Sequence, residues 1–259
     1  MIDIGVNLTS NRFDVDRQEV VDAAIAAGVS KMLITGTSVE ESRQALAIAQ
    51  KLPTTLASTA GIHPHYADGA SDDFIEQLTA LAAEPEVKAI GECGLDFNRN
   101  FSTPENQVNV FKEQIALAEK MQKPLFLHQR DAFDVWFECL APFIGNVPAM
   151  ISHCFTGNVS EMQQCIDAEM YIGVTGWVCD ERRGADLQAA VRELPLERLM
   201  IETDAPYLTP RTIRPRPKSS RNEPKYLPYV AEKIAELKSL SVEEVVAYAT
   251  ANSERVFAL

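Results

Sequence analysis

The segment Pro124-Leu125-Phe126-Leu127-His128-Gln129-Arg130 shows the pattern on which the fold prediction rests. Its consecutive apolar residues suit a strand that is buried on both faces of a parallel sheet, and a histidine follows them directly. The same arrangement, an apolar run and then a polar residue, recurs along the chain. The sequence therefore predicts a series of buried parallel strands whose carboxyl ends carry functional side chains.

Eight segments are predicted as strands, and amphipathic segments that are typical of helices lie between them. The predicted strands are Met1–Leu8, Lys31–Thr37, Thr55–Pro64, Val87–Asp96, Pro124–Arg130, Ala149–Gly157, Met170–Trp177 and Leu199–Pro206. The predicted helices include Val20–Ala27, Ser42–Leu52, Phe74–Ala83, Glu105–Met121, Met162–Glu169, Tyr226–Ser239 and Val242–Phe257. Eight strands in 259 residues give about 32 residues per unit, which is close to the repeat of a (β/α)8 barrel. We therefore predict an α/β fold of the TIM-barrel type, formed as one domain over residues 1–259.

A doubly wound open sheet is the alternative fold, because eight βα units do not by themselves prove that a sheet closes. The segment Met1–Leu8 is not followed by the glycine-rich fingerprint of dinucleotide-binding folds. The barrel is therefore the favoured prediction.

Charge and cysteine content restrict the class of protein. The chain has 24 basic and 37 acidic residues and a net charge of −13, which opposes a nucleic-acid coat protein or a binder of anionic membranes. Its five cysteines are odd in number and form no C-x-x-C pair, so a disulfide framework or a cysteine zinc site is not expected. No segment resembles a signal peptide or reaches the roughly 20 apolar residues of a membrane span. We expect a soluble, cytoplasmic protein without an obligate protein partner.

One segment is strongly basic. Between Arg211 and Lys225 there are six basic residues and one acidic residue, Glu223. We call residues 211–225 the basic segment. It follows the last predicted strand, so in a barrel it overhangs the carboxyl-terminal face, where barrel active sites lie. We predict that it contacts phosphate groups; a solvated loop held extended by its prolines is the alternative.

The histidines share one position relative to the predicted strands. All four histidines lie at or just beyond strand ends, and two acidic residues occupy similar places. These residues are His63, His65, Glu92, His128, His153 and Asp204. In a closed barrel the carboxyl ends of the strands meet at one rim. The sequence therefore predicts that these side chains converge there.

Imidazoles and carboxylates together form the ligand set of a divalent cation such as zinc, manganese or magnesium. Glu92, His128 and His153 supply three ligands and leave positions open for water and for a substrate oxygen. Such a cation lowers the pKa of its bound water and neutralises charge on a phosphoryl or carbonyl oxygen. Asp204 is placed to accept a proton from that water or to bind metal itself.

The pair His63-Pro64-His65 has two interpretations. An H-x-H pair on a strand directs both rings to one side, whereas Pro64 at a strand end is equally typical of a turn. We expect His63 to face the pocket and His65 to contact a substrate phosphate.

Five motifs, in this order, resemble those of the TatD family of metal-dependent deoxyribonucleases. They are Gly61–His65, Gly91–Asp96, His153–Gly157, Ile201–Tyr207 and Arg221–Pro224. The resemblance runs from Asp3 nearly to the end of the chain. It implies a TIM barrel of the amidohydrolase-like superfamily and exonuclease action from the 3' end of single-stranded DNA, with RNA as a further substrate. It also implies that Glu92, His128 and His153 bind the divalent metal and that Asp204 is the family's acid after the eighth strand.

The chain departs from the family at one place. Most members carry an H-x-H pair at the end of the first strand, whereas this chain has Gly5-Val6-Asn7. We therefore expect one firmly held metal, Mg2+ first and Mn2+ or Zn2+ as alternatives. Any second ion is expected to depend on phosphate oxygens of the substrate.

The resulting hypothesis is metal-assisted hydrolysis of phosphodiester bonds, with Glu92 and Asp204 as catalytic residues. The predicted substrate-binding residues are His63, His65, Arg211, Arg221 and Asn222, and the candidates for stacking on a terminal base are Phe155, Trp177 and Tyr207. The alternative enzyme is a metal-dependent amide, lactone or ester hydrolase on the same barrel. A third interpretation is an interaction module that binds metal without catalysis.

Overall fold

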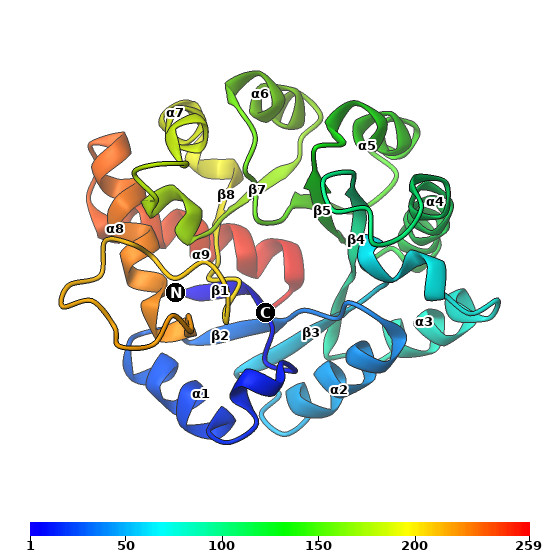
Figure 1. Cartoon of the computed structure of the whole chain (residues 1–259), viewed down its shortest axis with the longest axis horizontal. Coiled ribbons are helices and arrows are strands. Elements are labelled where there is room, and N and C mark those ends of the chain that lie inside the picture. Colours follow the sequence, from blue (N-terminus) through cyan, green and yellow to red (C-terminus); the bar gives the residue numbers. More distant parts are fainter. The chain divides into compact units, whose positions relative to one another are not determined.

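The computed structural model describes all residues 1–259, and its eight strands form one sheet in the order β1 to β8 (Figure 1). The strands are β1 (Ile2–Val6), β2 (Lys31–Ile34), β3 (Leu56–Ala60), β4 (Val87–Asp96), β5 (Leu125–Arg130), β6 (Met150–Ser152), β7 (Tyr171–Val174) and β8 (Leu199–Ile201). The α-helices are α1 (Arg17–Ala26), α2 (Val39–Ala49), α3 (Phe74–Ala82), α4 (Pro104–Met121), α5 (Phe133–Leu140), α6 (Val159–Asp167), α7 (Ala185–Glu193), α8 (Leu227–Lys238) and α9 (Val242–Phe257).

The connectivity confirms the predicted (β/α)8 fold. All eight predicted strands are present, and the pairs β3–β4, β4–β5, β5–β6 and β7–β8 are parallel. Val6 at the end of β1 forms a parallel bridge with Ala205, which follows β8. The two strands that would be the edges of an open sheet therefore meet, so the doubly wound alternative is wrong. Most strands are shorter than predicted, because their polar carboxyl ends leave the sheet.

The chain divides into two compact units, and each is described by itself. The first unit comprises Met1–Leu33, Cys154–Asp167 and Tyr171–Leu259, and the second comprises Ile34–His153 and Ala168–Met170. No helix has both the length and the unbroken apolar character that crossing a membrane requires.

In the second unit, β3, β4 and β5 lie next to one another and α4 packs on β4 (Figure 1). Helix α4 begins at Pro104 and is capped by Thr103, whose hydroxyl accepts a hydrogen bond from the backbone N–H of Asn106. Two of its buried side chains, Gln107 and Gln114, are seven residues apart, which is two helical turns, and they face the sheet side by side.

These two glutamines bind the backbone at the ends of two strands. The amide of Gln114 accepts from the N–H of Ile62 at 2.7 Å and donates to its carbonyl at 3.1 Å. The amide of Gln107 accepts from the N–H of Asp96 at 2.9 Å and donates to the carbonyl of Asp96 at 3.2 Å. Helix α4 thereby fixes the backbone directly before His63 and at the end of β4.

Strand β4 is irregular at the motif Gly91–Asp96. Its register against β5 moves from Ile90 opposite Leu125 to Cys93 opposite Leu127, so β4 contains one extra residue there. This is a bulge, a feature that redirects a side chain next to a functional site. Gly91 and Gly94 have φ angles of +134° and +145°, which only glycine adopts readily.

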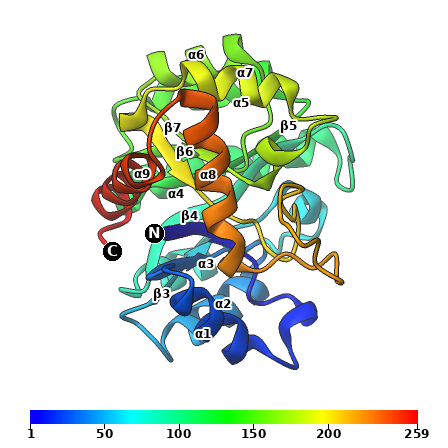
Figure 2. The same ribbon diagram turned by 90° about the vertical axis from the view of Figure 1, so that its left-hand side faces the viewer.

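In the first unit, β7 pairs with β8. Helices α8 and α9 pack against each other (Figure 2). The connection from β8 to α8 is long and contains only a short 3-10 helix, Pro224–Tyr226. The carboxyl ends of β7 and β8 therefore carry extended loops, and the basic segment is part of the second of them.

A buried carboxylate, Asp3 on β1, supports the backbone after β8. It accepts hydrogen bonds from the N–H of Thr203 at 2.9 Å, from its hydroxyl at 2.5 Å, and from the N–H of Gly5 at 3.3 Å. Burial outweighs these bonds and raises the pKa of Asp3 to about 7. Asp3 thus holds the residue that precedes Asp204.

This shift predicts a specific pH dependence of stability. Between pH about 4 and 7 the unfolded chain ionises Asp3 while the folded chain retains the proton, so the free energy of unfolding falls as pH rises. Asp3→Asn imitates the protonated carboxyl and should reduce this loss by on the order of 2 kcal/mol between pH 5 and 7.5.

Urea unfolding of both proteins at the two pH values measures the difference. The same change at the exposed Asp72 is the control and should leave the pH dependence unaltered. Equal slopes for the wild type and Asp3→Asn would show that Asp3 is ionised in the folded protein at pH 5.

Candidate metal and active site

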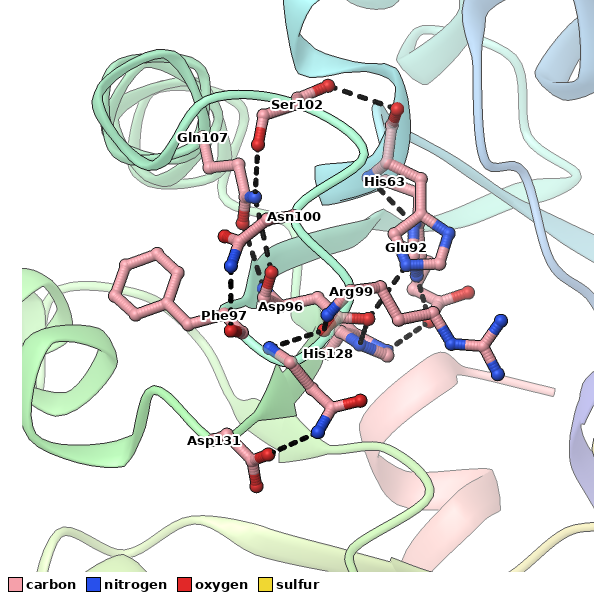
Figure 3. A network of polar contacts seen from close by, with 12 residues as sticks. His63, Glu92, Asp96, Phe97, Arg99, Asn100, Ser102, Gln107, His128 and Asp131 are labelled. Carbon is pink, nitrogen blue, oxygen red and sulfur yellow. Dashed lines mark hydrogen bonds and ion pairs between the residues drawn. The ribbon is translucent and has the colours of Figure 1, made fainter.

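Glu92 lies at the centre of a group of imidazoles in the second unit. Its Oε1 atom is 2.9 Å from Nδ1 of His128, 3.4 Å from Nε2 of His63 and 3.6 Å from Nε2 of His153. Figure 3 shows Glu92 between His63 and His128. The carboxylate is 6% exposed and projects from the bulge of β4, whereas the rings come from the ends of β3, β5 and β6. The predicted proximity of Glu92 to His128 and to His153 is confirmed.

Glu92 is ionised in this setting. Burial opposes the charged form, but the surrounding imidazoles and the hydrogen bond with His128 hold the pKa of Glu92 well below its usual range. Burial also lowers the pKa of His63 to about 4, so its ring is neutral near pH 7. The group therefore contains a buried negative charge that is surrounded by nitrogen atoms.

The hydrogen bonds of His63 fix its tautomer. Its Nδ1 atom accepts a hydrogen bond from the backbone N–H of His65 at 3.1 Å. The proton of the neutral ring is therefore on Nε2, which faces Glu92. An Nε2 that carries a proton has no lone pair for a metal, so His63 is a hydrogen-bond donor in this tautomer. In the other tautomer it could bind a metal ion together with Glu92 and His128, whose ligand atoms lie within 4.8 Å of its own.

His128 presents the opposite arrangement. Its Nδ1 atom is bonded to Glu92, and its Nε2 atom is buried without a hydrogen-bond partner. The nearest carboxylate oxygen, Oδ2 of Asp96, is 3.7 Å away, which is too far for a hydrogen bond. Burial lowers the pKa of His128, but Asp96 and Glu92 outweigh it and raise that pKa above its usual value. The Nε2 atom faces Asp96, on the side of the ring away from Glu92, and a buried ring nitrogen without a hydrogen-bond partner fits a divalent cation.

His153 lies on another side of Glu92. It is 3% exposed, its ring packs on Phe126 with centroids 4.5 Å apart, and its backbone N–H bonds to the carbonyl of Leu127. The residues of this unit whose ligand atoms all lie within 4.8 Å of one another are His63, Glu92 and His128. One carboxylate with two imidazoles fits a divalent cation, and His153 as a ligand stays a prediction.

Asp96 is a site residue that ends the motif Gly91–Asp96 and was not predicted from the sequence. Its Oδ2 atom is 2.7 Å from Nε2 of His65, and its Oδ1 accepts from the backbone N–H groups of Asn98 and Arg99 (Figure 3). Burial opposes ionisation, but the nearby His128 ring, through its charge, and the hydrogen bonds from the Arg99 N–H and His65 hold the pKa of Asp96 below its usual range. Its place four residues after Glu92, at the end of the same predicted strand, was the available signal.

Asp204 belongs to the first unit. It has a φ angle of +52°, its carboxylate accepts a hydrogen bond from the Asn7 side chain at 2.9 Å, and its N–H donates to Gly5 at 2.8 Å. The two residues that stand in place of the family's H-x-H pair therefore hold Asp204. Whether Asp204 accepts a proton or binds metal stays a prediction.

The predicted binding residues of the basic segment differ in accessibility. The guanidinium of Arg221 pairs with Asp16 at 2.7 Å and with Glu223 at 3.1 Å, and Asn222 is fully buried with its amide donating to the carbonyl of Thr203. Arg211 pairs with Glu181 at 3.2 Å. These contacts support the loop, and substrate binding by the three residues stays a prediction.

The three aromatic candidates for stacking also differ in how far their side chains are exposed. Phe155 is 4% exposed and belongs to the core, whereas Tyr207 is 53% exposed. Trp177 is half-buried and lines a pocket of the first unit.

Comparison with known proteins gives a consistent relationship. A protein named 3'-5' ssDNA/RNA exonuclease TatD from Pectobacterium atrosepticum is 51% identical over 259 residues, all of both chains. A protein of the same name from Salmonella typhimurium is 50% identical over 257 residues, 99% of this chain and 98% of the relative. The crystal structure of a TatD homologue from Escherichia coli has a TM-score of 0.90 at 27% identity, over 100% of this chain and 98% of that one.

The family model described as TatD related DNase matches residues 2–258. This match covers nearly the whole chain and includes every strand and helix described above. The chain therefore belongs to the family of TatD-related DNases.

Proposed function

We propose that this protein is a metal-dependent 3'-5' exonuclease that hydrolyses phosphodiester bonds of single-stranded DNA and RNA. The observation that supports this most strongly is the Glu92 group with its unpartnered His128 nitrogen, in a chain 51% identical over its full length to a TatD exonuclease. Glu92, His128 and His153 hold a divalent cation, Mg2+ first and Mn2+ or Zn2+ as alternatives. When bound, the cation supplies positive charge next to the scissile phosphate.

The residues around this group have separate roles. His63 faces the pocket and holds Glu92 through its Nε2–H, and Asp96 orients His65, which contacts a phosphate oxygen of the substrate. Asp204 accepts the proton of the attacking water. Its support is its place directly after β8, on the side of a parallel sheet where barrel active sites lie, and the Asn7 amide that fixes its carboxylate.

A labelled oligonucleotide tests this function. A single-stranded DNA labelled at its 5' end should give a ladder of successively shorter labelled products with Mg2+, and no products with EDTA. A 5' exonuclease would release labelled mononucleotide at once, and an acyl hydrolase would leave the DNA intact and cleave an ester substrate. RNA of the same sequence tests the second substrate.

The variant His153→Ala tests whether the cleavage depends on the proposed metal site. The variant should lose the ladder and bind less Mn2+ in equilibrium dialysis, because one of three ligands is gone. A ladder of unchanged rate from His153→Ala, with no ladder from a mock purification, would remove His153 from the metal site.

A further inference from the structure

A pocket opens between the two long loops of the first unit. It has a volume of about 280 Å3 and lies between the segment after β7, around the 3-10 helix Gly176–Cys179, and the segment 208–220 after β8. Six residues give it its chemical character: Trp177, Asp180, Arg183, Leu208, Arg211 and Arg216. It therefore combines an aromatic surface with three guanidinium groups.

One wall of the pocket is fixed before any ligand binds. The guanidinium of Arg183 lies 4.4 Å from the centroid of the Trp177 ring. Its Nε and Nη2 atoms donate to Oδ2 of Asp180 at 3.0 Å and 2.9 Å. Asp180 is 3% exposed, and its Oδ1 accepts from the backbone N–H of Arg182 at 3.0 Å. The guanidinium is thus stacked over the indole ring and held there by Asp180.

The charge on the opposite side of the pocket is only partly neutralised. Arg211 is paired with Glu181 at 3.2 Å and lies 3.9 Å from Asp180. Arg216 is exposed and forms no ion pair or hydrogen bond. In a chain with a net charge of −13, an exposed guanidinium that lines a pocket is available to an anionic group.

We propose that this pocket binds one nucleotide of a single-stranded nucleic acid, its base on the Trp177–Arg183 surface and its phosphate on Arg216. The proposal rests on the proposed function and adds a binding site to it. Bases of single strands stack on aromatic rings and on guanidinium planes, whereas phosphates pair with arginine. The volume suits one nucleotide rather than several. Loops after strands 7 and 8 are also a frequent place for phosphate binding in (β/α)8 barrels.

Tryptophan fluorescence tests the stacking, with EDTA present so that the strand is not cut. The probe is a hexamer of thymidylate. Trp136 is fully buried, so a stacked base should quench the emission of Trp177 alone. Trp177→Ala should abolish the quenching and weaken binding, measured by anisotropy of labelled hexamer, about tenfold. Trp177→Phe keeps an aromatic ring and should retain most of the affinity.

The salt dependence of binding tests the phosphate contact. Arg216→Gln removes one phosphate contact, so the slope of log K against log salt should become shallower by about 0.7. Arg192→Gln removes the same charge from an exposed position on α7 outside the pocket and should leave the slope unchanged. Both arginines are exposed, so these variants also serve if Trp177→Ala does not fold.

The outcomes separate this proposal from the proposed function. A normal ladder from the wild type, together with unchanged emission at hexamer concentrations that give full anisotropy change, overturns the pocket assignment alone. An equal slope of log K against log salt for Arg216→Gln and the wild type also overturns the pocket assignment alone. Quenching without any ladder keeps the pocket assignment and overturns the exonuclease proposal, and absence of both overturns both.

Discussion

Glu92→Gln is expected to lower the rate of Mg2+-dependent cleavage about a thousandfold or more. Glu92 is the only anionic group among the three donors, and hard cations such as Mg2+ depend on carboxylate oxygens. The amide has nearly the same size but carries no charge, and its NH2 group is a donor where the cation needs an acceptor. The ladder assay with 5'-labelled single-stranded DNA measures the rate.

Binding and folding must be measured beside this rate. Equilibrium dialysis with Mn2+ should show weaker binding by Glu92→Gln, while Glu76→Gln, at an exposed position on α3, should match the wild type in both assays. Urea unfolding shows that the variant remains folded. A folded Glu92→Gln whose rate is within tenfold of the wild type would remove Glu92 from the metal site and with it the proposed mechanism.

Gly94→Ala is expected to lower the free energy of unfolding by at least about 3 kcal/mol. The φ angle of Gly94 is +145°, and a Cβ atom there would lie 1.9 Å from the carbonyl oxygen of His128. Because Gly94 is directly opposite His128 in the β4–β5 pair, the two strands must separate to admit the methyl group. The variant should therefore also bind less Mn2+, since His128 moves away from Glu92.

Substitutions at two other glycines of the same unit separate the effect of backbone strain from the effect of the steric clash. Gly145 has a φ angle of +83° with open space around it, so Gly145→Ala measures the backbone strain alone, about 1 kcal/mol. Gly69 has open space and an ordinary φ angle, so Gly69→Ala should be neutral or slightly stabilising. Urea unfolding should rank the variants in that order. A Gly94→Ala protein as stable as Gly145→Ala would contradict the close packing of β4 on β5.

The order of apolar and polar residues along the chain predicted the strands and helices well, and strand β5 shows why. In β5 the residues Leu125, Phe126 and Leu127 are fully buried and His128 is more exposed, as the apolar run followed by a histidine indicated. Burial on both faces of a parallel strand leaves a direct mark on consecutive residues. The contact of Glu92 with His128 and with His153 followed from the barrel topology, because strand ends converge whatever the side chains between them.

Hydrogen bonds between distant segments could not be predicted in this way. Gln107 and Gln114 resemble any polar residues of an amphipathic helix, yet they fix the backbone at Asp96 and Ile62. Arg221 has the sequence context of a phosphate-binding residue, but it pairs with Asp16, far away along the chain. Such contacts depend on which side chains the fold brings within 3 Å, and no local pattern records that distance.

The sequence by itself determined the succession of strands and helices, the family and the residue types that gather at strand ends. Those properties follow from the pattern of apolar and polar residues along the chain, and each residue adds to that pattern through its own side chain. Only the tertiary structure decided which ring nitrogen of His63 carries the proton, which nitrogen of His128 is left without a partner, and which arginine of the basic segment is unpaired. Each of these depends on the distance and direction of one partner atom, and those are fixed only when the whole chain has packed.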